Sequence, residues 1–257
     1  MKYLKSNFSD ISRIRIKDIP LYVIEPKEKS FGVKNLIFYH GWSSSSLKQI
    51  FRGNIFSAFG YRVFLPDAIY HGERSPIDYE DSKIGSQYFI YCINKNIRES
   101  KDIISYIKNK YPYEDIGVAG HSMGAISSAG VFTSDEDLKA AMIFNGILDY
   151  EYFVDRAKEK VDFSKLNEKF KQAPAYLLEV NPMNNLDKLI DRPLLLFNGD
   201  EDNIIDPDIQ EDCSKKLYKL YKNKELLSFK RFELTTHQLT SQMLEEAIIF
   251  LKDRVNF

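Results

Sequence analysis

The chain has 257 residues, which fits one α/β domain with a modest insertion and suffices for a sizeable hydrophobic core. Its formal net charge is −1 at pH 7, which excludes the strongly basic character of proteins that bind nucleic acid or an anionic membrane. Any electrostatic attraction for a substrate must therefore be local.

Cysteine usage and apolar runs indicate the compartment. Cys92 and Cys213 are too few for a disulfide framework and are not spaced as metal ligands, which favours a reducing environment. The first 18 residues contain no apolar segment typical of a signal peptide, and no later run reaches the roughly 20 apolar residues of a membrane helix. We expect a cytoplasmic protein with neither a membrane nor a nucleic acid as partner.

Strand and helix patterns alternate along the chain. The β-forming residues around Asp18-Ile19-Pro20 predict an antiparallel hairpin at a sheet edge. Further strands are predicted at 35–39, 62–66, 116–119, 139–145, 193–198 and 226–234, and helices at 47–59, 83–110, 208–221 and 239–252. This alternation predicts an α/β fold in one domain, residues 1–257, with a mostly parallel sheet flanked by helices.

Residues 146–191 differ from the rest because they are rich in aromatic and charged residues. Helical patterns occur at about 150–160, 163–172 and 184–190. We interpret this segment as a small helical cap insertion over the strand ends; ordinary crossover helices are the alternative.

A serine between glycines lies at the centre of the chain. Gly120-His-Ser122-Met-Gly124 matches G-x-S-x-G, the pattern of a strained turn that leads from a strand into a helix and exposes a serine hydroxyl. A short apolar run precedes it, and small residues suited to a closely packed helix follow. The amide of Met123, at the helix N-terminus, would donate to an oxyanion. The alternative is a loop serine without chemistry.

A serine nucleophile needs a base within hydrogen-bond reach. Of the four histidines, only His237 follows Ser122, as the chain order serine, acid, histidine requires. His40 and His121 belong to glycine turns, and His71 belongs to a polar loop. The histidines have neither H-x-x-x-H nor H-x-H spacing, so we expect no metal site.

The acid should come from a strand end between the serine and the histidine. The strand at 193–198 leads into Gly-Asp-Glu-Asp, which offers three carboxylates. We favour Asp202 because the turn after Gly199 should direct the third residue back across the strand tips. Asp200 and Glu201 are the alternatives.

The second oxyanion donor should lie in the loop after the strand at 35–39, which reads His40-Gly41-Trp42. We predict the backbone N–H of Trp42 in this role. Its indole is either a wall of the acyl pocket or part of the core, and His40 is expected to bond loop backbone. Polar residues of the next loop are candidates for a network beside the pocket: Asp67, His71, Glu73 and Arg74.

These motifs resemble those of the α/β-hydrolases over nearly the whole chain. The matching segments, in that family's order, are His40-Gly41-Trp42, Gly120-His-Ser122-Met-Gly124, Gly199-Asp-Glu-Asp202 and His237. The segment from Leu65 to Arg74 is also similar to bacterial serine esterases of the dienelactone-hydrolase and prolyl-oligopeptidase-like branch. The resemblance implies that Ser122 is the nucleophile, Asp202 the acid, His237 the base, and Trp42 and Met123 the oxyanion donors.

Departures from related families narrow the expected function. His-Gly-Trp replaces the His-Gly-Gly-Gly of hormone-sensitive-lipase-like enzymes, and a serine stands where dehalogenases have aspartate. We expect a serine carboxylesterase that hydrolyses small or medium acyl esters without a cofactor. The alternatives are a thioesterase or small-peptide hydrolase with the same residues, and a non-catalytic ligand-binding protein. The sequence does not specify an oligomeric state.

Overall fold

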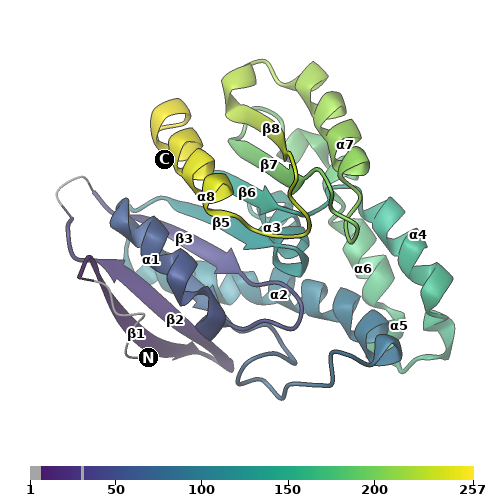
Figure 1. Ribbon diagram of the computed structural model, residues 1–257. Helices are drawn as coiled ribbons and strands as arrows, with labels where there is room; N and C mark the ends of the chain where they lie inside the picture. Colours follow the sequence, from purple (N-terminus) through teal and green to yellow (C-terminus); the bar gives the residue numbers. More distant parts are fainter. Residues whose placement is uncertain (1–6, 30–31) are drawn as a thin grey trace.

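The computed structural model describes residues 7–29 and 32–257, in which eight strands form one sheet. The strand order is β1-β2-β4-β3-β5-β6-β7-β8 (Figure 1). β1 and β2 form the predicted edge hairpin, β2 pairs antiparallel with β4, and the strands from β4 to β8 in this order run parallel. The strands are β1 (Ser9–Ile16), β2 (Ile19–Pro26), β3 (Lys34–Tyr39), β4 (Tyr61–Pro66), β5 (Ile116–His121), β6 (Ala140–Phe144), β7 (Leu194–Gly199) and β8 (Leu227–Phe232).

Helices cover both faces of this sheet (Figure 1). On one face, α1 and α8 pack against apolar side chains of the strands, and on the other face α2, α3 and α7 do so. The prediction of an α/β fold with a mostly parallel sheet is therefore confirmed. The helices are α1 (Ile50–Ala58), α2 (Ser82–Lys110), α3 (Met123–Ser134), α4 (Tyr150–Lys160), α5 (Glu168–Lys171), α6 (Ala173–Glu179), α7 (Pro207–Leu220) and α8 (Ser241–Ile249).

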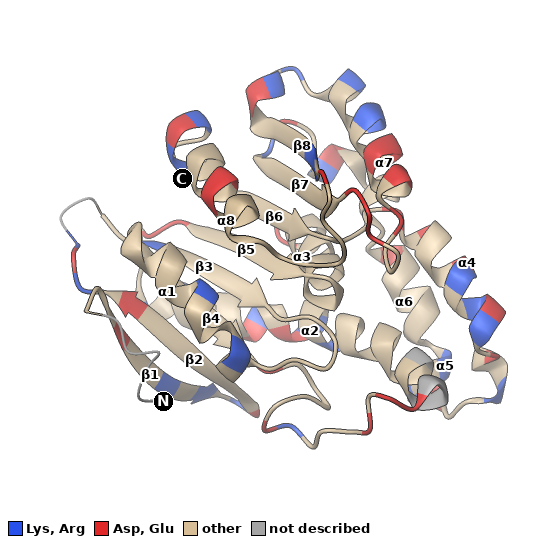
Figure 2. Ribbon diagram, in the orientation of Figure 1, with Lys and Arg blue, Asp and Glu red and all other residues tan. Residues whose placement is uncertain are grey.

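The central strands are buried on both faces, which explains why they read as continuous apolar runs. Every residue of β4, β6 and β7 is buried. Charged residues lie mostly on the outer faces of the helices and in loops (Figure 2). This arrangement leaves the polar residues at the carboxyl ends of the parallel strands as the natural place for chemistry.

Several elements differ from the sequence prediction, among them the helical pattern at about 184–190, where the structure has only 3-10 turns at Pro182–Asn184 and Leu186–Lys188. The sequence analysis did not predict α6, because Pro174 interrupts the apolar pattern. Proline is tolerated in the first turn of a helix, since the N–H that it lacks would have no intrahelical acceptor there. β8 ends at Phe232 rather than at residue 234, because Leu234 has a left-handed backbone (φ 53°) that leaves the strand.

The cap segment, which we define as residues 146–191, is built mainly of short helices. It contains α4, α5 and α6, together with three 3-10 turns. α5 and α6 pack against α2, where the rings of Tyr88 and Phe170 lie 4.6 Å apart. Phe153 of α4 lies 5.8 Å from Phe89 of α2. The segment is therefore anchored to the amino-terminal half of α2.

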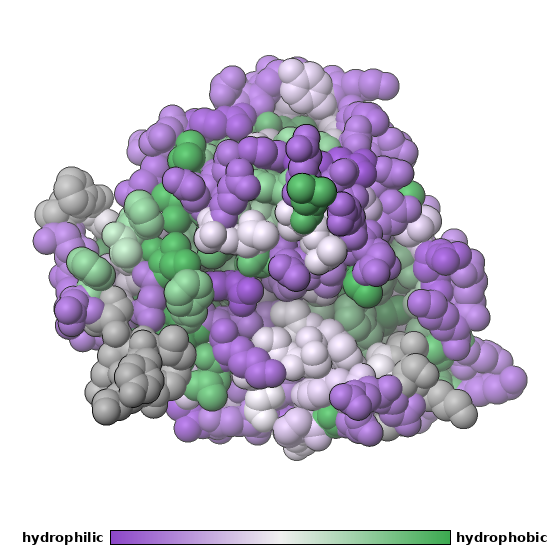
Figure 3. All heavy atoms as spheres, in the orientation of Figure 1, coloured by the Kyte–Doolittle hydropathy of each residue, from purple (hydrophilic) through white to green (hydrophobic). Residues whose placement is uncertain are grey.

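The surface seen in Figure 3 is mostly hydrophilic, with apolar side chains gathered over α1. Phe51 and Phe59 are the large apolar residues exposed at the two ends of that helix. None of the helices in the described part of the chain is long and apolar enough to cross a membrane.

Candidate active site

Ser122 occupies a strained turn between β5 and α3. Its backbone has φ 57° and ψ −121°, a conformation that L-residues rarely adopt. A Cβ at Gly120 would lie 2.2 Å from the carbonyl oxygen of Gly124, and a Cβ at Gly124 would lie 2.1 Å from that of Tyr39. Only glycine fits at these two positions, because backbone carbonyl groups lie too close for a Cβ atom. The turn presents the Ser122 hydroxyl at the carboxyl edge of the sheet.

His237 lies between Ser122 and Asp202. The Oγ of Ser122 donates a hydrogen bond to Nε2 of His237 over 2.7 Å. Nδ1 of the same ring donates to Oδ2 of Asp202, also over 2.7 Å. The structure thus brings together the three residues that the sequence analysis selected, from the turn after β5, the loop after β7 and the loop after β8.

The carboxylate of Asp202 is fully shielded from solvent. Its second oxygen, Oδ1, accepts hydrogen bonds from the backbone amides of Ile204 and Ile205, at 2.9 and 3.0 Å. Burial raises the pKa of this carboxyl, but the hydrogen bonds from His237 and from the two amides outweigh burial, so the pKa lies below its ordinary value. Asp202 is therefore held as a carboxylate that can orient His237.

The two alternative acids do not meet His237. Asp200 points away and pairs with Nε of Arg231 at 2.7 Å. The backbone N–H of Glu201 donates to the carbonyl of Thr235, and the Glu201 side chain is exposed. A Cβ at Gly199 would lie 2.2 Å from that same carbonyl, so the two loops touch through their backbones.

The backbone amides of Trp42 and Met123 are among those near Ser122 that have no protein acceptor within the described residues. Met123 is the first residue of α3, where amides lack intrahelical acceptors. The loop of Trp42 is close as well, since a Cβ at Gly41 would lie 3.4 Å from Cβ of Ser122. The indole of Trp42 packs 5.4 Å from the ring of Phe89, which contacts the cap segment.

The polar side chains of His40 and Asp67 hold the loop that carries Trp42 through hydrogen bonds to backbone groups. His40 donates through Nδ1 to the carbonyl of Gly41 and accepts through Nε2 from the amide of Ala68. Burial lowers the pKa of His40, so the ring stays neutral in this role. Asp67 accepts from the amide of Ser46 at 2.7 Å, which ties the loop after β4 to the loop after β3. His40 thus bonds loop backbone, as expected.

Asn145 is a residue near the site that the sequence analysis did not single out. It follows β6 with a left-handed backbone (φ 49°), and its side chain is fully buried. Nδ2 donates to the carbonyl of Gln238, next to His237, and to Nε2 of His121, next to Ser122. A polar residue before glycine at the end of a buried strand was the available signal.

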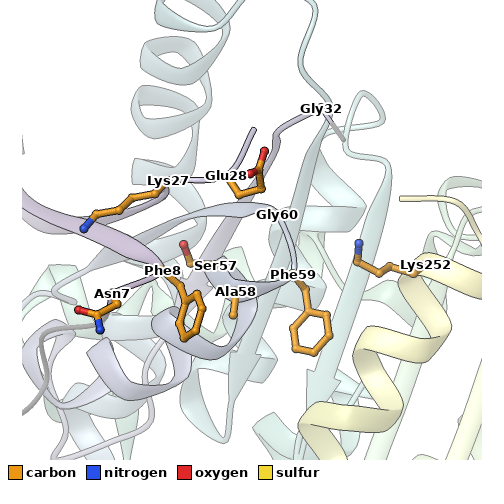
Figure 4. A pocket seen from close by; sticks show the side chains of 10 residues that line it. All are labelled: Asn7, Phe8, Lys27, Glu28, Gly32, Ser57, Ala58, Phe59, Gly60 and Lys252. Atoms are coloured by element: carbon orange, nitrogen blue, oxygen red, sulfur yellow. The ribbon is translucent and has the colours of Figure 1, made fainter. Parts of the chain in front are cut away.

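A cavity of about 380 Å³ lies elsewhere, where the β1–β2 hairpin meets the end of α1 (Figure 4). Phe8, Phe59 and Lys252 are among its lining residues, and Ser122, Asp202 and His237 are not. We therefore do not assign it to the chemistry of Ser122. Within residues 7–29 and 32–257, no group of three or more His, Cys, Asp or Glu side chains is placed to hold a metal ion.

The sheet order and the strand–serine–helix turn define the class of protein, the α/β-hydrolase fold. A similar solved structure is TT1662 from Thermus thermophilus, with a TM-score of 0.79 at 17% identity, covering 97% of this chain and 99% of that one. The sequence profile of the Dienelactone hydrolase family matches residues 21–245. The chain therefore belongs to the dienelactone hydrolase family and is a hydrolase.

Two named relatives share the sequence over most of its length. Esterase YjfP of Escherichia coli (strain K12) is 26% identical over 256 residues, covering 96% of this chain and 99% of the relative. YitV of Bacillus subtilis (strain 168) is 27% identical over 206 residues, covering 74% of this chain and 77% of the relative.

Proposed function

We propose that the protein is a serine carboxylesterase that hydrolyses small or medium acyl esters through Ser122, His237 and Asp202. The observation that carries the proposal is the unbroken hydrogen-bonded path from the Asp202 carboxylate through His237 to the Ser122 hydroxyl. Membership of a hydrolase family and similarity to a relative named an esterase support the same chemistry. The reaction needs no cofactor.

The first half of the reaction forms an acyl-enzyme. Nε2 of His237 takes the hydroxyl proton as Oγ of Ser122 attacks the ester carbonyl carbon, and the carbonyl π electrons move onto oxygen. Asp202 keeps the proton on Nδ1, which leaves Nε2 free to accept. Collapse of the tetrahedral intermediate breaks the bond to the alcohol oxygen, which takes the proton from His237. The alcohol leaves and the acyl group remains on Ser122.

The second half releases the acid. A water molecule attacks the acyl carbon while Nε2 of His237 takes one of its protons. The intermediate then breaks the bond to Oγ, which recovers that proton. In both halves the amides of Trp42 and Met123 would donate to the oxyanion, a contribution worth roughly 3–4 kcal/mol per donor in transition-state stabilisation.

The cap segment, residues 146–191, would complete the binding site within a single domain spanning residues 1–257. It reaches the loop of Trp42 through contacts of Phe153 with Phe89 and of Phe89 with the indole. In this proposal the segment limits the size of the bound ester, which is the small-molecule partner of the protein.

The test is hydrolysis of p-nitrophenyl esters from acetate to palmitate by the wild type and by Ser122→Ala. We expect saturable activity that is lost in the variant, and a chain-length optimum that measures the acyl pocket. Labelling of Ser122 by a fluorophosphonate gives a second readout. Labelling without ester turnover would redirect the proposal to thioesters or small peptides, and absence of both would indicate a ligand-binding protein.

A further inference from the structure

The side chain of Asn145 contacts a residue next to Ser122, a residue next to His237 and a residue at the start of the turn that carries Asp202. Nδ2 donates to Nε2 of His121 at 3.3 Å and to the carbonyl of Gln238 at 2.8 Å. Oδ1 accepts from the amide of Gly199 at 2.8 Å. His121 precedes Ser122, Gln238 follows His237, and Gly199 begins the turn that leads to Asp202.

The backbone around Asn145 adds further bonds between the same segments. Its N–H donates to the carbonyl of Phe197 in β7 at 2.7 Å, and the amide of Ser122 donates to the carbonyl of Phe144 at 3.0 Å. The residue is therefore fixed between β5 and β7 by its main chain. Only its side chain reaches across to the loop of His237.

An amide is the group that this position requires. It must donate two hydrogen bonds and accept one, which neither a carboxylate nor a hydroxyl can do. The left-handed backbone also favours asparagine over most residues. Because the side chain is fully buried, loss of any of these bonds would leave polar groups without water.

The bond to His121 has an electrostatic consequence. Since Nε2 of His121 accepts from Asn145, the ring is neutral with its proton on Nδ1. Burial, together with the nearby His237 ring 5.2 Å away, lowers the pKa of His121 to about 3. A neutral His121 leaves His237 free to take up a proton during the reaction.

We propose that Asn145 is a positioning residue that sets the relative placement of Ser122, Asp202 and His237 by bonding the three loops that carry them. The proposal rests on the proposed function for its catalytic meaning. Asn145 itself touches neither the hydroxyl nor the substrate, so its effect appears in the rate of the chemical steps rather than in substrate binding.

The decisive variant is Asn145→Asp, which keeps the shape and the acceptor for Gly199 but loses both donors. The matched control is Asn198→Asp. Asn198 is also fully buried at a strand end, and its Nδ2 donates to the carbonyl of Gly146 rather than to a triad loop. Each protein is titrated with a fluorophosphonate, so that rates refer to active sites and not to the folded fraction.

We expect Asn145→Asp to lower kcat on p-nitrophenyl butyrate by about 100-fold with less than about a 3-fold change in KM. The new carboxylate beside His121 and His237 should also move the acid limb of the kcat/KM profile to higher pH. Asn198→Asp should keep the wild-type acid limb and a kcat within about 5-fold. A structural role alone would not change kcat per titrated site, so a wild-type kcat per site for Asn145→Asp would overturn the proposal.

A second measurement does not depend on turnover. The proton between Nδ1 of His237 and Asp202 gives a low-field NMR signal, which should shift or vanish in Asn145→Asp and persist in Asn198→Asp. If the wild type hydrolyses no ester, the esterase proposal fails and this signal alone decides the positioning role. An unchanged signal in Asn145→Asp would then refute it.

Discussion

The carboxylate of Asp202 accepts Nδ1–H of His237 over 2.7 Å on one oxygen, and two backbone amides on the other. Asp200, two residues earlier, instead pairs with Arg231 at the surface. One acidic turn thus contains a carboxylate that orients a histidine and a carboxylate that forms an exposed ion pair. The two differ in solvent exposure, since the Asp202 side chain is fully shielded and that of Asp200 is 44% exposed.

This difference predicts opposite outcomes for two isosteric substitutions. Asp202→Asn should lower kcat by roughly 10⁴-fold, because the amide favours the wrong tautomer of His237. Asp200→Asn removes only an exposed ion pair, so kcat should change by less than about 3-fold. Steady-state kinetics on one p-nitrophenyl ester measures both. Full activity of Asp202→Asn together with loss of activity in Asp200→Asn would show that the acid is misassigned.

The glycines of the serine turn allow a steric prediction. In Gly124→Ala the new methyl would meet the backbone carbonyls of Tyr39 and His40, which cannot move without disturbing β3. In Gly130→Ala it would meet the flexible end of the Ile97 side chain. We expect Gly124→Ala to lose fluorophosphonate labelling and at least about 3 kcal/mol of unfolding free energy, and Gly130→Ala to lose about 1–3 kcal/mol. Urea unfolding measures the free-energy losses, and fluorophosphonate labelling measures the reactivity of Ser122. Equal losses of unfolding free energy in the two variants would contradict this prediction.

Arg74 and Glu99 form a buried ion pair under the loop after β4. Two guanidinium nitrogens bond the two carboxylate oxygens at 2.7 and 2.8 Å, and Arg74 also donates to the carbonyl of Asp67. Arg74→Met or Glu99→Met alone should lower the unfolding free energy by about 2–3 kcal/mol, because each removes the bidentate partner of a buried charge. The loss stays below that of a fully unpaired charge, since Asp18 still pairs with Arg74 and Lys95 with Glu99. The double variant should recover most of that loss. Unfolding curves of the wild type, the two single variants and the double variant form the cycle, and additive losses would mean that the pair is not coupled.

Local sequence patterns predicted several residues of the candidate site. Gly120 is required by its contact with Gly124 in the same turn, and a histidine after the last strand is indicated by chain order. The choice of Asp202 over Asp200 followed from how a turn reverses direction. Strand positions followed from apolar runs, because strands covered on both faces have no polar side to interrupt the run.

The remaining features depend on contacts between distant segments. Asn145 bonds a residue 93 positions later in the chain, so no local pattern shows its partners. α6 was missed because Pro174 reads as a break until its place in a first helical turn is known. The exposed role of Asp200 likewise depends on Arg231, which belongs to another strand. Local sequence patterns therefore predict candidate residues, whereas the contacts between those residues depend on how distant segments pack.

His71 predicts a pH dependence of stability. Burial, with a smaller contribution from the nearby His40 ring, lowers the pKa of His71 from an ordinary value of about 6.5 to about 4. The folded protein therefore keeps this ring neutral while the unfolded chain takes up a proton, so stability is lost as the pH falls from about 6.5 to about 4. The full contribution is about 3 kcal/mol. Above pH 7 His71 should have no effect on the pH dependence.

The measurement compares urea unfolding of the wild type and of His71→Gln at pH 8 and pH 5. Glutamine does not titrate and can still donate a hydrogen bond to the carbonyl of Ile69, which His71 contacts at 2.9 Å. Between the two pH values the wild type should lose about 2 kcal/mol more than the variant. His40 and His121 are present in both proteins, so their titration cancels in the difference. If the wild type and His71→Gln lost the same unfolding free energy between pH 8 and pH 5, His71 would take up its proton in the folded state near its ordinary pKa.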